Sequence, residues 1–348
     1  MEKTDIRSNT KEELEAFLAE IGEKKYRVNQ ILQWIWTKNA KSFKEMTDIS
    51  KKLREELDTH FYIPHLRIEN KQISEDGTIK YLFYLPEGQF VEGVLIPSEN
   101  RTTACLSSQT GCSLGCKFCA TAGLKYKRQL TAGEIIDQFY ALNHLSEEKY
   151  GKRLSNIVFM GMGEPLMNTE NMLNAINIIT SKEYFEFSPQ RVTLSTAGLC
   201  GQIKELADRQ VKFNLAISLH TANNKKRTQL MPINKSNNLD DLKDAIQYFH
   251  NKTGTRISYE YLLLKDYNDS AEDAREFAEF CKISPCKINL IEYNKVEGLP
   301  FERSTPEKTH AFISILESRN LIVYKRTSRG EDIDAACGQL ANKKNNPS

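Results

Sequence analysis

The chain has 348 residues, of which 40% are apolar and 27% are charged, as in an ordinary globular protein. A net charge of +2 argues against a protein that binds nucleic acid through overall charge alone. No apolar run reaches the roughly 18 residues of a membrane span, and the charged N-terminal sequence is unlike a signal peptide. We therefore expect a cytoplasmic protein, in which eight cysteines predict metal binding or catalysis rather than a disulfide framework.

The N-terminal part is predicted to contain short helices followed by paired strands. Apolar residues recur at helical spacing within residues 11–58. The pattern then alternates between apolar and polar residues, and Asp76-Gly77 is a turn signal between two of the runs. These runs are 66–74, 79–86 and 90–97. The sequence therefore predicts a small helical domain with a β-hairpin extension in residues 1–97.

Strand-like and helical segments alternate through the rest of the chain. The strand-like runs are 103–108, 156–161, 191–196, 213–220, 256–264, 287–293 and 321–327. Helical patterns follow most of them, for example at 131–151 and 270–282. Repeated βα units predict a parallel sheet covered by helices, and six or seven units fit a partial, open α/β barrel better than a complete one. We assign this barrel to residues 98–330 and a C-terminal segment to residues 331–348.

Glycine-rich or polar stretches follow several predicted strands. They are a cysteine loop after the first strand, and then residues 161–165, 195–198, 218–220 and 292–294. Active sites of α/β barrels gather at the carboxyl ends of the strands. The sequence therefore predicts that these stretches form a single site.

The cysteine loop carries Cys112, Cys116 and Cys119 at the spacing C-x3-C-x2-C. Closely spaced thiolates are typical of iron–sulfur clusters, and a 4Fe–4S cluster with three protein ligands leaves one iron open. Zinc is the alternative. Structural zinc sites need four ligands, however, and this loop holds neither a second C-x2-C pair nor a histidine. The spacing favours the cluster.

This triad, in the loop after the first strand of an α/β barrel, resembles the radical S-adenosylmethionine (SAM) superfamily, and Phe118 also fits the family pattern. The resemblance implies one 4Fe–4S cluster per chain, whose open iron binds SAM and cleaves it to a 5′-deoxyadenosyl radical. It also implies that SAM is held by residues from the other stretches. These are Gly163, Glu164, Ser195, Ser218, Leu219, His220 and Asn294. Each alone could be an ordinary structural residue, but their common position favours a binding site.

Five segments narrow the resemblance, and together they extend over nearly the whole chain. They are 90–97, 105–123, 159–168, 230–234 and 329–341. They resemble the RNA adenine-C2 methyltransferases of the RlmN type. The resemblance implies methylation of C2 of an adenine in 23S rRNA, near the peptidyl-transferase centre, and of the tRNA adenine 3′ of the anticodon. Two SAM molecules would be used per turnover.

The same resemblance gives roles to three further residues. Adenine C2 is electron-poor, so a thiolate on the enzyme has to take the methyl group first, and Cys337 matches that acceptor. Cys105 matches the resolving thiol, which forms a transient disulfide with Cys337 and releases the base. Glu92 matches the acceptor of the C2 proton. From the residues alone, Cys105 would be a buried strand cysteine and Glu92 an outward-facing strand residue.

Two alternatives stay open. One is Cfr-like antibiotic resistance, in which C8 of the same rRNA adenine is methylated; the other is a non-catalytic, zinc-bearing protein that interacts with RNA. The resemblance also implies an electron donor such as flavodoxin or ferredoxin, and we expect a monomer that does not bind membranes. RNA contact is expected from the N-terminal helices and from three basic stretches. These are Lys125, Lys127 and Arg128; Lys225, Lys226 and Arg227; and Lys325, Arg326 and Arg329.

Overall fold

The fold is built around a ten-stranded sheet in the computed structural model, which describes residues 3–342. The strand order is β14-β13-β12-β11-β10-β9-β6-β5-β4-β3, so β14 and β3 are its two edges and the sheet is not closed. The strands β6 and β9 to β14 run parallel to one another. Their bounds are β6 Arg101–Cys105, β9 Asn156–Phe159, β10 Val192–Thr196, β11 Asn214–Ser218, β12 Ile257–Leu263, β13 Cys286–Glu292 and β14 Val323–Arg326. Each overlaps one of the strand-like runs of the sequence, and the predicted open α/β barrel is confirmed.

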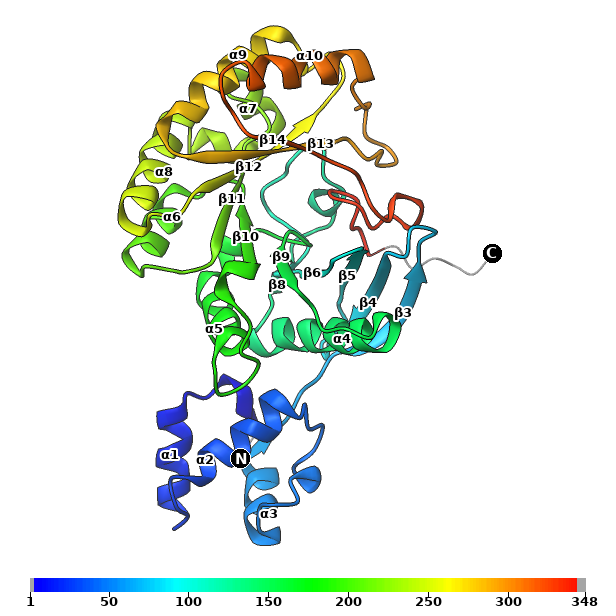
Figure 1. The fold of residues 1–348 in the computed structure, drawn as a ribbon. Helices are drawn as coiled ribbons and strands as arrows, with labels where there is room; N and C mark the ends of the chain where they lie inside the picture. Colours follow the sequence, from blue (N-terminus) through cyan, green and yellow to red (C-terminus); the bar gives the residue numbers. More distant parts are fainter. Residues whose placement is uncertain (1–2, 343–348) are drawn as a thin grey trace.

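Helices connect the parallel strands and cover the outside of the curved sheet (Figure 1). Within this layer α4 packs on α5, α6 on α8, and α9 on α10. Their bounds are α4 Ala132–Tyr150, α5 Thr169–Thr180, α6 Cys200–Asp208, α7 Asn224–Leu230, α8 Leu239–Thr253, α9 Ala271–Phe280 and α10 Pro306–Glu317. The helices therefore leave the inner surface of the sheet to the loops at the strand ends.

Local sequence explains where the long helices begin and end. Thr131 caps the N-terminus of α4 in a capping box with Glu134, and Gly151 ends the helix in the left-handed conformation at φ 64°. Ser270 starts α9 in the same way, with Asp273 as its partner. All seven residues of β12 are buried, as expected for a central parallel strand that is covered on both faces.

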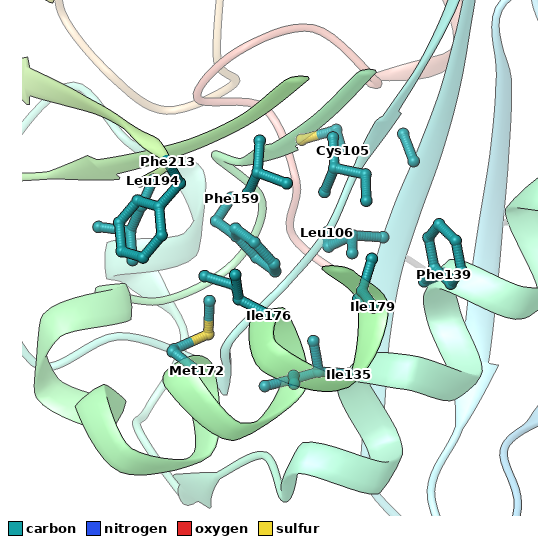
Figure 2. Packing of buried hydrophobic residues seen from close by; sticks show 14 of the residues in the cluster. Cys105, Leu106, Ile135, Phe139, Phe159, Met172, Ile176, Ile179, Leu194 and Phe213 are labelled. Atoms are coloured by element: carbon teal, nitrogen blue, oxygen red, sulfur yellow. The ribbon is translucent and has the colours of Figure 1, made fainter. Parts of the chain in front are cut away.

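The core lies between the sheet and its helices. Figure 2 shows Phe159 and Leu194 from the strands packed against Ile176 of α5, with Ile135 of α4 nearby. These side chains are at most 3% exposed. Burial of apolar surface contributes about 25 cal/mol to stability for each Å², so this packing is the main source of stability.

The antiparallel strands β3 (Arg67–Ile73), β4 (Ile79–Tyr84) and β5 (Phe90–Ser98) form the hairpin that the sequence predicts. They are not a separate extension, however. β5 pairs with β6, with Val94 opposite Cys105, so the hairpin continues the core sheet. One consequence is that residues of β4 and β5 lie beside the strand that leads into the cysteine loop.

The N-terminal helices form a small body next to the barrel (Figure 1). It contains α1 (Lys11–Glu20), α2 (Arg27–Leu32) and α3 (Lys51–His60), closed by a parallel pairing of β1 (Thr4–Asp5) with β2 (Phe61–Tyr62). The predicted helices of residues 11–58 are therefore present. A buried ion pair joins this body to the barrel, with Arg7 Nη1 3.0 Å from Asp137 Oδ2 of α4.

Short elements fill the connections. β7 (Gln109–Thr110) pairs with β8 (Arg128–Gln129). The short helical turns are η1 Ile6–Ser8, η2 Gln33–Thr37, η3 Phe43–Glu45, η4 Ala120–Gly123, η5 Pro165–Asn168, η6 Pro189–Arg191, η7 Pro232–Lys235, η8 Cys281–Ile283 and η9 Glu331–Ile333. Within residues 3–342, no helix combines the length and the apolar character needed to cross a membrane.

Candidate active site

The cysteine loop opens into a cavity at the carboxyl ends of the parallel strands. The pairing of β7 with β8 closes the base of the loop, and Lys117 N donates to Leu230 O at 2.9 Å. The cavity has a volume of about 160 Å³. Cys112, Cys116 and Cys119 all line it. The three thiols that the sequence predicts as ligands therefore share one space.

Burial sets the acidity of these thiols. It raises the pKa of Cys112 to about 11, and it raises the pKa of Cys116 further, with the charges of the other two cysteines acting in the same direction. A bound cation has the opposite effect on thiol acidity, because a thiol that coordinates a metal is deprotonated outright. Among the residues that the structure describes, no three His, Cys, Asp or Glu side chains converge on a point that suits a single metal ion.

The loop after β9 approaches the cavity through its glycines. A Cβ atom on Gly161 would lie 2.6 Å from Ser107 Oγ, and one on Gly163, where φ is +97°, would lie 2.5 Å from Gln109 Cβ. Only glycine fits at these two positions. Glu164 follows and lines the cavity, but its carboxylate already accepts two backbone N–H groups, at Leu166 (3.0 Å) and Ala197 (2.8 Å). Glu164 thus ties the loop after β9 to the loop after β10.

The ends of β10 and β11 add hydroxyl groups and an imidazole to the cavity wall. Ser195 Oγ and Ser218 Oγ lie 3.3 Å apart, and both residues line the cavity. His220 has a positive φ of 59°, and its Nδ1 accepts a hydrogen bond from Leu262 N at 3.0 Å. Its ring packs edge-on against Phe118, with 4.7 Å between the ring centroids. Burial, together with the charge of Arg227, lowers the pKa of His220 to about 3, so the imidazole is neutral. Leu219 is fully buried, and its side chain belongs to the core instead of the cavity.

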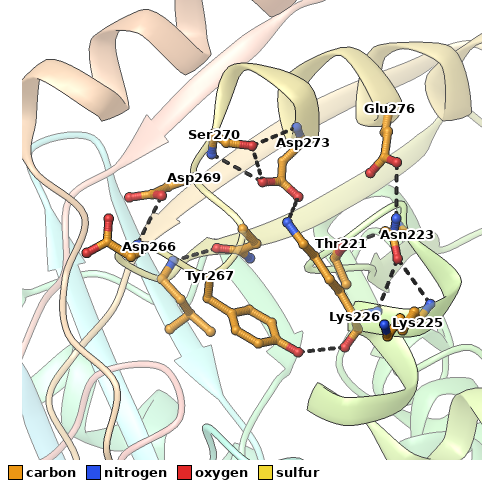
Figure 3. Close-up of polar contacts among 12 residues, drawn as sticks. Thr221, Asn223, Lys225, Lys226, Asp266, Tyr267, Asp269, Ser270, Asp273 and Glu276 are labelled. Atoms are coloured by element: carbon orange, nitrogen blue, oxygen red, sulfur yellow. Dashed lines mark hydrogen bonds and ion pairs between the residues drawn. The ribbon is translucent and has the colours of Figure 1, made fainter.

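A polar network outside the cavity braces the loop that carries Ser218 and His220 (Figure 3). Asn223 caps α7, and its Nδ2 donates to Glu276 of α9 at 3.1 Å. Lys226 Nζ lies 2.6 Å from Asp273 Oδ1, also on α9, while Tyr267 donates to the carbonyl of Lys226 at 2.8 Å. The loop after β11 is therefore fixed to two helices.

Arg227 corrects the prediction of a basic surface at residues 225–227. It is fully buried, and its guanidinium donates to Leu219 O (3.3 Å), Ala197 O (2.6 Å) and Asn234 Oδ1 (2.8 Å). Burial lowers its pKa to about 10. Arg227 joins the loops after β10 and β11, and no feature of the basic stretch in the sequence distinguishes it from a surface residue.

The C-terminal segment, residues 330–342, returns to the cavity and to β4 and β5 (Figure 1). Gly338 O accepts from Ala120 N at 2.8 Å, and Leu340 O accepts from Thr121 Oγ1 at 2.7 Å, directly after Cys119. These contacts place Cys337 in the cavity wall. Its side chain is solvent-accessible there.

Asn294 lies behind this segment instead of lining the cavity. Its Nδ2 donates to Cys337 O at 3.4 Å, whereas its Oδ1 is buried and accepts no hydrogen bond from residues 3–342. An unsatisfied buried acceptor of this kind costs about 1–3 kcal/mol.

Cys105 lies at the end of β6, at the edge of the core, where the C-terminal segment passes (Figure 2). Burial raises the pKa of its thiol to about 12, and a charge on Cys337 acts in the same direction.

Glu92 is buried rather than outward-facing, contrary to the expectation from the strand pattern alone. Its Oε1 lies 3.0 Å from Lys80 Nζ. Its Oε2 accepts from the backbone N–H groups of Ala341 (2.8 Å) and Asn342 (3.2 Å). Glu92 therefore does not line the cavity but contacts the segment that carries Cys337.

Glu260 is a cavity residue that the sequence analysis did not select. It lies on β12 between Ser218 of β11 and Asn289 of β13, and Asn289 Nδ2 donates to its Oε1 at 2.6 Å. Burial raises its pKa. Glu260 is the one charged residue of the strand β12, Ile257–Leu263, and this was a signal that could have identified it.

Two family models match the chain. Residues 4–63 match the Ribosomal RNA large subunit methyltransferase N-terminal domain, and residues 106–281 match the Radical SAM superfamily. A protein of Christiangramia forsetii, named "Probable dual-specificity RNA methyltransferase RlmN", is 50% identical over 341 residues, which cover 98% of this chain and 97% of that protein. The chain belongs to the RlmN family. The resemblance noted in the sequence is therefore confirmed.

Further relatives agree with this membership. The "Dual-specificity RNA methyltransferase RlmN" of Geotalea uraniireducens is 42% identical, with 98% of this chain and 97% of that protein covered. A crystal structure of a radical SAM methyltransferase from Sphaerobacter thermophilus superposes with a TM-score of 0.91 at 38% identity, over 98% of this chain and all of that one. Membership of the radical SAM superfamily implies SAM and a 4Fe–4S cluster as cofactors.

Proposed function

We propose that this chain is a radical SAM methyltransferase that methylates C2 of adenine in 23S rRNA and in tRNA. The observation that carries the proposal is the position of Cys337. It lines the same cavity as Cys112, Cys116 and Cys119, and the segment that carries it passes the end of β6, where Cys105 lies (Figure 2). A methyl carrier, a resolving thiol and a cluster site are thus available within one site.

Cys112, Cys116 and Cys119 are the proposed ligands of one 4Fe–4S cluster per chain. Their shared cavity, whose lining includes the glycines Gly161 and Gly163, fits a cluster with SAM beside it. When bound, the cluster and SAM supply a methyl group and, from a second SAM, a 5′-deoxyadenosyl radical. The superfamily match supports this donor set over zinc.

The proposed SAM contacts come from four strand ends. Backbone groups at Gly163 can approach the ligand, and the hydroxyls of Ser195 and Ser218 can donate to its ribose or carboxylate oxygens. His220 would present a neutral ring, because its pKa is low. The other proposed contact residues are Glu164, Leu219 and Asn294. Leu219 can contribute only its backbone, since its side chain is buried in the core.

Three residues would perform the transfer to RNA. The Cys337 thiolate would take the methyl group, lose a hydrogen atom from it, and form a bond from that carbon to adenine C2. Glu92 would accept the C2 proton. With the remaining unpaired electron passed to the cluster, Cys105 would then attack the sulfur of Cys337. This step would form a disulfide and break the bond between that sulfur and the carbon on C2, and the released carbon would take a proton to become the methyl group of the base. The disulfide would have to be reduced before another turnover.

RNA has to deliver an extruded base to this cavity. We propose that residues 1–97 contact RNA, that residues 98–330 form the catalytic barrel, and that residues 331–348 carry Cys337; residues 343–348 lie outside the described part of the chain. The match of residues 4–63 to a ribosomal RNA methyltransferase domain supports an RNA role for the N-terminal helices. An electron donor such as flavodoxin or ferredoxin, and a monomeric state, are further parts of the proposal.

The test is anaerobic reconstitution followed by mass analysis of modified adenosine. Iron with acid-labile sulfide is expected in the protein, and it should be lost when the three cysteines of the triad are replaced by alanine. Treated 23S rRNA and tRNA should both contain 2-methyladenosine. The appearance of 8-methyladenosine would show the C8 activity instead, and stoichiometric zinc without iron would contradict the proposal.

A further inference from the structure

Lys80, on β4, is a buried cation whose side chain is only 4% exposed. Its Nζ lies 3.0 Å from Glu92 Oε1 and donates to the backbone carbonyl of Asp334 at 3.1 Å. A charge taken out of water is costly unless it is paired and hydrogen-bonded. Both contact partners of Lys80 lie next to the site, so its ammonium group faces the site rather than solvent.

The sheet register explains why these groups meet. Lys80 is opposite Val94, and Leu82 is opposite Glu92. Val94 is in turn opposite Cys105 of β6. Because alternate residues of a strand share a face, Lys80, Glu92 and Cys105 all project from the same face of the sheet.

Glu92 and Lys80 together hold both ends of the loop that carries Cys337. Lys80 binds the carbonyl of Asp334, before the cysteine, and Glu92 Oε2 accepts the N–H groups of Ala341 and Asn342, after it. The ion pair between Lys80 and Glu92 connects these two anchors. Cys337 is thus at the tip of a loop whose base is closed by one buried ion pair.

We propose that Lys80 is a positioning residue for RNA methylation. It orients the Glu92 carboxylate and fixes the loop that carries Cys337. The position of the proton acceptor relative to the methyl-bearing sulfur therefore stays constant. The inference rests on the proposed function and adds a residue that does not line the cavity. A displacement of reacting groups by about 1 Å can lower a rate by about 10²-fold, so loss of this cation should be visible in kcat.

The test compares Lys80→Met, which removes the charge, with Lys80→Arg, which keeps it. Lys80→Met should lower kcat for RNA methylation by about 10- to 100-fold with an unchanged KM for RNA, and Lys80→Arg should recover most of the rate. Lys252→Met is the matched control. Lys252 lies on α8 in the outer helix layer, where it forms an exposed ion pair with Asp208 at 3.5 Å, and the kcat of Lys252→Met should equal that of the wild type.

Two results would overturn the inference. One is a folded, iron-loaded Lys80→Met protein whose kcat is within about twofold of the wild-type value; the other is an equal loss of kcat in Lys80→Met and Lys80→Arg. If Lys80→Met does not fold, Lys80→Gln, which keeps a donor without the charge, is assessed by the same criteria. A wild-type protein that methylates neither Cys337 nor RNA would refute the proposed function, irrespective of Lys80.

Discussion

At the scale of single residues, burial keeps Cys105, the proposed resolving thiol, in its protonated form. Burial raises the pKa of Cys105 to about 12, and a negative charge on Cys337 raises it too. Attachment of carbon to the sulfur of Cys337 excludes such a charge. Only burial then opposes formation of the Cys105 thiolate at the stage at which the proposed reaction requires its attack.

Replacement of Cys105 by alanine should therefore block release of the product without preventing its attachment. We expect a protein–RNA adduct on a denaturing gel, sensitive to nuclease and absent when Cys337 is also replaced. Cys281→Ala is the matched control, since Cys281 is also buried but lies on η8, away from the cavity. It should lose stability by about 1 kcal/mol and still release methylated RNA. Normal turnover by a folded Cys105→Ala protein would remove Cys105 from the mechanism.

At the scale of elements, the loops at the strand ends form the site, and glycines allow these loops to adopt their conformations. Gly163 combines a positive φ with close contact to Gln109, whose Oε1 accepts from Glu164 N at 2.7 Å. The loop after β9 and the strand β7, which leads into the cysteine loop, therefore meet without space for a side chain.

Gly163→Ala should lower the free energy of unfolding by about 1–3 kcal/mol and weaken SAM binding, because the loop has to move away from Gln109. Gly201→Ala is the control. Gly201 lies in α6 with nothing within 4 Å of an added Cβ, so this change should stabilise the protein by about 0.5–1 kcal/mol. Calorimetric SAM titration and urea unfolding measure both effects. Equal SAM affinity in the two variants would contradict the role of the Gly163 loop.

Much of this arrangement was predictable from the sequence. The parallel strands were predictable because most are short runs rich in apolar and β-branched residues that alternate with helical patterns, and the spacing of the cysteine triad identified the cysteine loop. Contacts between residues or short strands that lie far apart in the sequence were not predictable. Arg227 sits among lysines in the sequence, yet the loops after β10 and β11 enclose it. The two-residue strands β7 and β8 are too short to give a periodic signal.

At the scale of the whole molecule, one buried contact connects the N-terminal helices to the barrel. Arg7 packs directly on α4, where an added Cβ on Gly133 would lie 2.6 Å from its guanidinium carbon. Asp137 of α4 accepts from Arg7 and also from Leu66 N at 3.1 Å. The orientation of the helical body relative to the cavity thus depends on this ion pair.

Arg7→Ala should destabilise the protein by about 3–5 kcal/mol, because it leaves the buried Asp137 carboxylate without its cation. Urea unfolding gives the magnitude, and limited proteolysis should show earlier cleavage between the helical body and the barrel. Lys3→Ala is the control, since its pairing with Asp58 is exposed at 3.5 Å and should contribute less than about 1 kcal/mol. A loss below about 1 kcal/mol for Arg7→Ala would show that other contacts hold the helical body.

The return of the C-terminal segment to the first strands of the sheet also has a consequence for biosynthesis. Cys337 follows Cys105 by about 230 residues, which at about 5–20 residues per second corresponds to roughly 10–50 s of translation. Throughout that interval the two thiols cannot form a disulfide with each other. The cysteine triad also emerges well before residues 338–340, which contact the end of its loop. A growing chain therefore presents the three cysteines of the triad, the proposed cluster ligands, before the segment that contacts their loop has been made.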